Sequence, residues 1–549
     1  MNFTVTPKSV LVFLLLGAVL SQLVKPGVMV VMLAILLLCF TKPCMCTVTH
    51  KRPLLSFLQK YAGYILFIQC AVYALAYNAL MPGGMYFSPD SVLYLSVSNI
   101  VPPTFSLLAR SLIELEVALG STRIIFLRYV VIAIFCMGGW LIAKALFRSK
   151  HPLLAVFVLP TIWSMSSLTQ WFNYFLTDGI ATAFLIACIG AYANMYVSIQ
   201  EGEEKDYSAW RWLAMFVLFG MMAFSMRPAF AFVAPVMVII MMNRAIFSWR
   251  RIAGVTLGIT LLAAAHMSLA IYWHGRTPSQ LGGVLTALVF DLPIPTVCPA
   301  DDESDLCNTQ RALEPFIQAS NGLGTYREQY LYKVLNNGKV VRTARSAVHG
   351  NDPNYSVLLD IALLKIKYSP IEYVAMVLKN SYYSIKSWGD WAWNDSFRNV
   401  AKVNIANTNA VAPAVSASMK TIAKIDFNPM IKESPKELFY MDILLQFPRL
   451  VMKHNLLNNW TSVILIVVFI FSVRPFLFVT SLPGSILFSC CVFGLVGTIF
   501  QNAFFPVIPR LLDPFHPLGA LGFVMLISMV IDRVKFEKLK RSDIENISL

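Results

Sequence analysis

Apolar runs dominate this chain, and polar residues gather between them. Twelve stretches are apolar enough for membrane-spanning helices, which need roughly 20 such residues each. They lie near residues 9–23, 26–40, 55–80, 123–147, 152–169, 176–198, 210–225, 229–243, 252–273, 460–473, 476–500 and 515–532. The first two are short for full spans and could form a hairpin that crosses only in part. The pattern predicts an all-α polytopic membrane protein with about 12 transmembrane helices.

The longest polar interruption separates the ninth and tenth spans and predicts an insert domain of mixed structure. We divide the chain into an N-terminal membrane hairpin (1–52), a transmembrane core (53–273) with an outer loop (81–122), an extracytoplasmic domain (274–459), and C-terminal transmembrane helices with a cytosolic tail (460–549). Spaced apolar residues predict insert helices at Ser356–Lys367 and Ile371–Ser387. We find no internal repeat.

Composition supports the membrane assignment, and charge orients it. Hydrophobic residues make up 57% of the 549 residues and charged residues 13%, where soluble domains carry about 25% charged residues. The net charge is +15; the predicted inner segments hold seventeen Lys and Arg residues, and the short outer segments hold five. The positive-inside rule therefore predicts cytoplasmic termini and an insert outside the cytosol. No basic-aromatic stripe or phosphate-binding glycine loop indicates nucleic-acid binding.

Two cysteines fall in the predicted outer insert, within "CPADDESDLC". Cys298 and Cys307 are nine positions apart, and outside the cytosol such a pair can form a disulfide. The acidic residues between them lack the spacing and glycine of a known calcium loop. A solvated loop is the favoured interpretation, and we assign no metal ligands.

Four charged residues flank apolar spans on the predicted outer side: Asp90, Asp178, Arg227 and Arg510. Charges beside membrane helices are costly and therefore informative. Two acids and two arginines suit sugar transfer from a lipid-linked phosphate, because a base must deprotonate the acceptor and cations must stabilise the departing phosphate. Simpler roles remain open. Asp90 could cap a helix, the arginines could be interface anchors, and Asp178 could pair structurally with an arginine.

The order of these residues resembles the GT-C glycosyltransferases, integral membrane enzymes that use polyprenyl-phosphate sugars. "FSPDSVLYL", with Asp90 and Tyr94, resembles the first outer loop of that family. "NIVPPTFSLLARSLIELEVALGSTRIIFLRY" is similar to its surface helices. "YFLTDGIATAFL" and "AFSMRPAFAF" resemble its later acid and its arginine-proline turn. "FFPVIPRLLDPFHPLGALGF" is similar to its late arginine motif, with Leu511 in place of the usual tyrosine.

The resemblance implies an inverting single displacement in which Asp90 is the base. It also implies that Arg227 and Arg510 hold the donor phosphate and that Tyr94 lies near the acceptor. Asp178 would orient the acceptor or an arginine, or help to hold a divalent cation, which stays open. Further candidates for phosphate contact are Arg128, His274 and Arg276.

The insert also contains "SIKSWGDWAWNDSF". The indole faces of Trp388 and Trp391 could stack on a sugar, and the Asp390 carboxylate could accept hydrogen bonds from its hydroxyls. The alternative is an interfacial aromatic belt at headgroup depth.

Together these features predict a membrane glycosyltransferase in a bacterial inner membrane, with a periplasmic active site. Its expected partners are a polyprenyl-phosphate-sugar donor, a glycan, lipid or protein acceptor, and the bilayer; no nucleic acid and no certain cofactor are expected. One alternative is a polymerase or ligase of lipid-linked oligosaccharides, for which Arg345 and His349 are candidates. The others are a transporter or flippase, and a structural or receptor protein.

Overall fold

The structure, a computed structural model, describes residues 57–58, 60–80, 84–96, 103–149, 151–163, 173–202, 207–242, 247–274, 281–295, 298–299, 301–352, 355–387, 397–430 and 481–504, and 518–519, 521–522, 524–525 and 528. Within these ranges the chain is helical, and it contains no strand beyond one isolated bridge.

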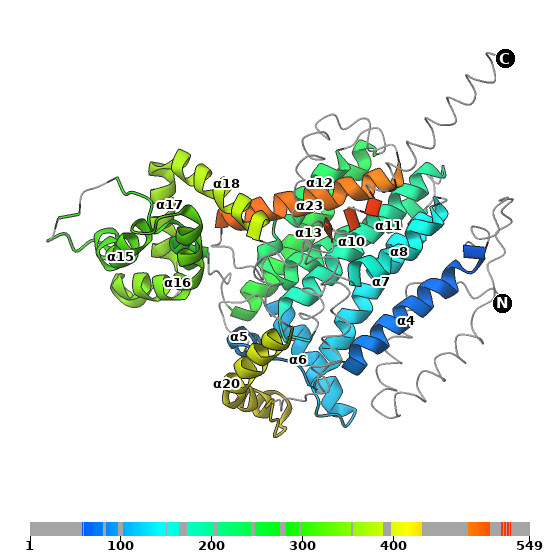
Figure 1. Cartoon of the computed structure of the whole chain (residues 1–549), viewed down its shortest axis with the longest axis horizontal. Helices are drawn as coiled ribbons and strands as arrows, with labels where there is room; N and C mark the ends of the chain where they lie inside the picture. The colour runs from blue at the N-terminus through cyan, green and yellow to red at the C-terminus, as the bar shows by residue number, and fades with distance from the viewer. Residues whose placement is uncertain are drawn as a thin grey trace, which may run out of the picture.

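Five described helices are long and apolar enough to cross a membrane, which makes this an integral membrane protein. They are α7 (Phe126–Arg148), α10 (Thr177–Gln200), α11 (Tyr207–Met226), α13 (Trp249–His274) and α23 (Leu482–Phe504). Three shorter apolar helices accompany them in the bundle: α4 (Ala62–Leu80), α8 (Pro152–Trp163) and α12 (Val233–Met241) (Figure 1).

Helix α10 forms the centre of this bundle. Every side chain from Thr177 to Ser198 is buried, and α10 contacts α7, α11 and α23. Glycines let α7 and α10 approach closely, as small residues do in membrane bundles. A Cβ at Gly138 would lie 2.7 Å from the backbone nitrogen of Ala187, and one at Gly190 would lie 2.6 Å from the Cβ of Leu141.

Two surface helices, α5 (Pro89–Leu95) and α6 (Pro103–Ala118), lie at the end of the bundle where α7 begins (Figure 1). The buried Glu116 carboxylate, on α6, accepts the N–H groups of Ile125 (2.7 Å) and Phe126 (2.9 Å). Glu116 therefore caps the N-terminus of α7, whose first N–H groups have no partners within the helix. The Arg110 guanidinium likewise donates to the Leu95 carbonyl (2.7 Å) and caps the C-terminus of α5.

A second group of helices packs around apolar cores of its own. It comprises α14 (Leu281–Val289), α15 (Asp305–Asn321), α16 (Tyr326–Ala347), α17 (Ser356–Tyr368) and α18 (Pro370–Ser387). Figure 1 shows this group beside the bundle, where α14 and α18 contact α23. Helix α20 (Phe397–Ala423) returns to pack against α5 and α6.

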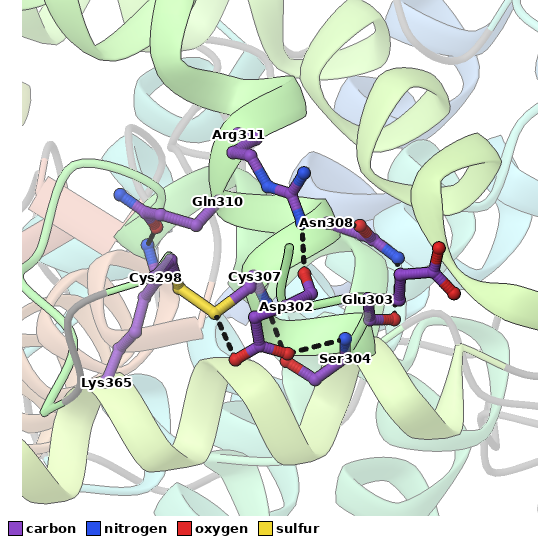
Figure 2. The surroundings of a disulfide bond; sticks show 9 residues. All are labelled: Cys298, Asp302, Glu303, Ser304, Cys307, Asn308, Gln310, Arg311 and Lys365. Atoms are coloured by element: carbon purple, nitrogen blue, oxygen red, sulfur yellow. Dashed lines mark hydrogen bonds between the residues drawn. A yellow bond between two sulfur atoms is a disulfide. The ribbon is translucent and has the colours of Figure 1, made fainter. Parts of the chain in front are cut away.

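A disulfide joins Cys298 to Cys307 at the start of α15, with an S–S distance of 2.00 Å. Figure 2 shows Asp302 beside it, where the carboxylate accepts the Ser304 N–H (2.8 Å) and the Cys307 N–H bonds the Ser304 hydroxyl (3.3 Å). The acidic loop therefore leads directly into α15, and its Ser304 caps the N-terminus of that helix.

Helices occupy eight of the predicted spans, and α17 and α18 match the two helices predicted in the insert. The spans at 9–23, 26–40 and 460–473 lie outside the described residues, and 515–532 is described only in part. The total of twelve, the domain boundaries and the orientation therefore stay predictions. The insert was expected to have mixed structure. Its described residues form helices joined by loops, with no strand, because apolar residues recur there at helical spacing.

Glu116→Gln should destabilise the protein by about 1–2 kcal/mol, because a neutral amide oxygen is a weaker cap for the two N–H groups of α7. Thermal unfolding in detergent, followed by circular dichroism, measures the change. Glu114→Gln is the matched control, since Glu114 is exposed on the same helix. Equal effects of the two substitutions would contradict the capping role.

Two buried lysines lie at the C-terminal end of α14. Lys333 donates to the carboxylate of Asp291 (2.7 Å) and to the carbonyl of Leu288 (3.3 Å). Lys365 donates to the carbonyl of Phe290 and to Oε1 of Gln310, both at 2.8 Å; Figure 2 shows the contact with Gln310. Burial lowers the pKa of Lys365 from 10.5 to about 8.

This pKa predicts a specific dependence of stability on pH. Between about pH 8 and about pH 10.5 the unfolded chain binds a proton that the folded chain has released, so the unfolding free energy rises with pH in that window. The slope approaches roughly 1.4 kcal/mol per pH unit.

Relative to Lys365→Met, the wild-type protein should therefore gain stability as the pH rises from about 7.5 to about 9.5. Melting temperatures of both proteins at the two pH values test this. Lys367→Met, on the exposed side of α17, is the control and should show no such difference. A parallel pH profile for wild type and Lys365→Met would contradict the assignment.

Candidate functional site

Two short segments run side by side at the end of the bundle where α7 and α10 begin. Tyr86 and Tyr174 form an isolated parallel bridge. The Tyr86 N–H donates to the Asn173 carbonyl (2.8 Å), and the Phe175 N–H donates to the Tyr86 carbonyl (2.9 Å). The rings of Phe87 and Phe175 stack with centroids 5.4 Å apart. The pairing therefore holds the segment directly before α5 beside the segment directly before α10.

The parallel register places two carboxylates in equivalent positions. Asp90 follows Tyr86 by four residues, and Asp178 follows Tyr174 by four. Each lies in the first turn of its helix, where the helix dipole favours a carboxylate. The segments read "YFSPD" and "YFLTD", a short repeat that our sequence analysis missed. A search for a repeated Y-F-x-x-D pattern could have found this pairing.

Asp178 forms an ion pair with Arg227, and both side chains are buried, at 1% and 6% exposure. Arg227 lies in the turn between α11 and the 3-10 helix η2 (Pro228–Phe230), and its guanidinium lies over the Phe230 ring at 5.7 Å. The ion pair engages Nη1 of Arg227. A guanidinium carries five N–H donors, so Nε and Nη2 remain outside this pair and could bind a second anion.

Tyr94, on α5, contacts the start of α10 and is influenced by the charged residues of the site. Its hydroxyl lies 3.4 Å from the Thr177 hydroxyl. Burial raises the pKa of Tyr94, the Thr177 contact lowers it, the carboxylates of Asp178 and Asp90 raise it, and Arg227 lowers it. Three charged groups, one on α5, one on α10 and one in the turn after α11, therefore act electrostatically on one phenol.

Distant parts of the chain hold the segment that leads to Asp90. The Thr408 hydroxyl, on α20, accepts the Phe87 N–H (3.0 Å) and lies 3.2 Å from the Phe87 carbonyl, to which it can donate. The ring of Phe427 meets that of Phe87 edge-on, with centroids 6.0 Å apart. Arg128, on α7, donates to the Gly84 carbonyl (2.7 Å). No sequence motif marked Thr408, because a polar residue in a helix carries no sign of a non-local partner.

The structure thus gathers Asp90, Tyr94, Asp178 and Arg227. Arg128, expected to contact phosphate, is buried and contacts the loop before Asp90. His274 is the last residue of α13. Five candidates lie outside the described residues: Arg276, Trp388, Asp390, Trp391 and Arg510.

Arg345 and His349, the candidates for the ligase alternative, lie in the separate helix group. His349 Nδ1 is 2.8 Å from the carboxylate of Asp305. The hydrogen bond from the His349 backbone N–H, and after it this side-chain contact, lower the pKa of Asp305. The Arg345 guanidinium lies over the Tyr355 ring at 5.2 Å. Both side chains have contacts inside their own group.

One buried amide beside the paired segments was not expected. Asn173 is fully buried, and neither its side-chain oxygen nor its nitrogen has a hydrogen-bond partner in the described part of the chain. Buried polar groups in proteins are nearly always satisfied by protein, water or ligand. Asn173 therefore leaves two polar atoms unsatisfied directly beside the paired segments. Within the same described ranges, no three His, Cys, Asp or Glu side chains come together as metal ligands.

Comparison with known proteins yields one similarity of structure. No family model matches the chain, and no curated protein does. The crystal structure of ArnT from Cupriavidus metallidurans bound to undecaprenyl phosphate is similar over 85% of this chain and 78% of that chain, with 10% sequence identity and a TM-score of 0.31. We therefore rest the functional proposal on the residues of this chain.

Asp178→Asn should destabilise the protein by about 3–5 kcal/mol, because it leaves the buried charge of Arg227 without its partner. The double substitution Asp178→Asn with Arg227→Gln should recover part of this loss, since no uncompensated charge remains. Thermal unfolding of both variants in detergent measures the difference.

Glu201→Gln is the matched control. Glu201 pairs with Arg148 at the opposite ends of α7 and α10, where both side chains are partly exposed. Exposed pairs contribute about 0–1 kcal/mol. If Asp178→Asn costs no more than Glu201→Gln, the Asp178–Arg227 pair does not carry the structural role described here.

Proposed function

We propose that this protein is a membrane glycosyltransferase that moves a sugar from a polyprenyl-phosphate donor to an acceptor hydroxyl. The observation that carries the proposal is the pairing of the two Y-F-x-x-D segments. It sets two carboxylates at equivalent positions at one end of a membrane bundle, and one of them pairs with a buried arginine. A phosphate at headgroup depth, with its lipid chain in hydrocarbon, would reach such a place.

The proposed step is a single displacement with inversion. The acceptor oxygen attacks the anomeric carbon, the bond from that carbon to the phosphate oxygen breaks, and Asp90 takes the acceptor proton. The departing phosphate gains negative charge, which arginine N–H groups stabilise through charge-assisted hydrogen bonds. The acceptor is a glycan, lipid or protein hydroxyl.

In this proposal Asp178 orients Arg227. Its carboxylate accepts a hydrogen bond from Nη1, and the other N–H groups of the guanidinium would bind the donor phosphate. Arg510 would supply a second positive charge there. The carboxylates of Asp178 and Asp90 both act electrostatically on Tyr94, which would contact the acceptor.

The distribution of basic residues supports a site on the outer face of the membrane. The segments expected on the inner side hold seventeen Lys and Arg residues, against five on the short outer segments, and such asymmetry follows membrane orientation. We therefore propose a periplasmic site in a bacterial inner membrane. An outer site would favour lipid-linked donors, because nucleotide sugars are held in the cytosol.

Asp90→Asn should lower the rate of transfer by about 10²- to 10⁴-fold, the usual contribution of a general base, while the lost interaction with the helix dipole should cost at most about 1 kcal/mol of stability. The assay uses purified protein in nanodiscs, a panel of undecaprenyl-phosphate-linked sugars and solubilised envelope lipids and glycans as acceptors. Release of undecaprenyl phosphate is the readout. Parallel reactions with EDTA show whether a divalent cation takes part.

Asp360→Asn is the matched control, because Asp360 is an exposed carboxylate on α17 in the other helix group. It should retain wild-type activity. If a folded Asp90→Asn protein transfers sugar at the wild-type rate, Asp90 is not the base. If no lipid-linked sugar is turned over by the wild-type protein, the donor class is wrong.

A further inference from the structure

Helix α18 has an unusual distribution of apolar side chains. Ile371, Val374, Leu378 and Tyr382 recur at spacings of three and four residues, so they share one face of the helix. They are 79%, 54%, 56% and 57% exposed. These four residues, named here the α18 stripe, form an apolar band that spans about 16 Å at 1.5 Å per residue.

The opposite side of α18 is buried and partly polar. Asn380 and Ser381 are 1% and 5% exposed, and Asn380 accepts a hydrogen bond from the Tyr326 hydroxyl (2.7 Å). The same buried side also holds Met376 and Val377, which are 6% and 7% exposed. α18 is therefore apolar on both sides, whereas a helix on the surface of a water-soluble domain exposes a polar face. An apolar outer face fits a helix that contacts hydrocarbon.

The position of α18 favours the same environment. Its Tyr373 hydroxyl donates to the carbonyl of Ala503, one residue from the end of the membrane-spanning α23. Figure 1 shows α18 beside that end of α23, and the two helices are in contact. α18 therefore lies where a membrane span ends.

This end of α23 belongs to the rim that carries the candidate site. The ring of Phe500, on α23, lies 6.1 Å from that of Phe232. Phe232 follows Arg227 by five residues and contacts Phe230, whose ring lies under the Arg227 guanidinium. The α18 stripe and the Asp178–Arg227 pair are thus at the same end of the bundle.

The borders of the stripe also suit a membrane interface. Tyr382 ends it, and tyrosine is enriched where bilayer meets water. Beside the stripe, the ammonium of Lys379 lies over the ring of Tyr326, with 5.2 Å to its centroid. A lysine at this depth can extend its charge to lipid headgroups while its stem follows apolar surface.

We propose that the α18 stripe rests on the lipid bilayer and holds the helix group α14 to α18 against the membrane beside the candidate site. The inference stands apart from the glycosyltransferase proposal, because it uses none of the site residues. It assigns to α18 an interfacial role like that of amphipathic helices that lie in the membrane surface. A second copy of the chain is the occupant that the test must separate from lipid.

The test places the photo-crosslinking residue p-benzoylphenylalanine at Ile371 or at Leu378 in the full-length protein. The protein is reconstituted into vesicles of phosphatidylethanolamine and phosphatidylglycerol and irradiated. Both positions are exposed, so an aromatic ketone should be tolerated there, and gel filtration checks each variant. Mass spectrometry then measures covalent phospholipid adducts.

Leu335 is the matched control, because it is an equally apolar side chain, 68% exposed, on α16 of the same helix group. We expect the yield of lipid adducts at positions 371 and 378 to be several-fold higher than at position 335. Equal yields at all three positions would overturn the proposal. Crosslinks between two copies of the chain at 371 or 378, in place of lipid adducts, would also overturn it and assign the stripe to a dimer.

Discussion

The ion pair between Asp178 and Arg227 is the interaction on which the site depends. Both charges are buried at the end of an apolar bundle, where a lone charge would be costly. Each residue therefore fixes the other. Asp178 lies in the first turn of α10, whose residues from Thr177 to Ser198 are all buried, and Arg227 directly follows α11 at a turn. Their contact sets the relative position of two membrane spans and leaves a partly engaged guanidinium beside two helix starts.

The paired segments around Tyr86 and Tyr174 extend this constraint to Asp90. Because the bridge is parallel, the two segments enter their helices in the same register. Asp90 therefore occupies the position in its segment that Asp178 occupies in the other. The Thr408 hydroxyl and the Arg128 guanidinium then hold the loop from the other side. Thr408 and Phe87 are 321 positions apart, so the loop depends on a helix formed much later in the chain. Pre-organisation of this kind is what a site for positioned proton transfer requires.

Sequence patterns anticipated a large part of this arrangement. Apolar runs located the described membrane helices. The resemblance brought Asp90, Tyr94, Asp178 and Arg227 into one proposed site. The structure pairs Asp178 with Arg227 and sets Tyr94 beside Thr177, and the site as a whole stays a proposal. Arg128, expected to contact phosphate, donates to the Gly84 carbonyl, and its contact with phosphate stays a prediction. A charge beside a span looks the same in sequence whether it meets a ligand or a backbone carbonyl. The Y-F-x-x-D repeat escaped notice because it is short and its two copies differ in their middle positions.

The sequence by itself determined the membrane character of the protein and the positions of its described spans. These follow from the length and apolarity of contiguous segments, which are local properties. Tertiary structure alone decided which charges pair, that Thr408 holds Phe87, and that the apolar face of α18 points away from its neighbours. Those outcomes depend on contacts between residues far apart in the chain. An amphipathic pattern shows that a helix has two faces, but only packing decides which face meets protein and which meets its surroundings.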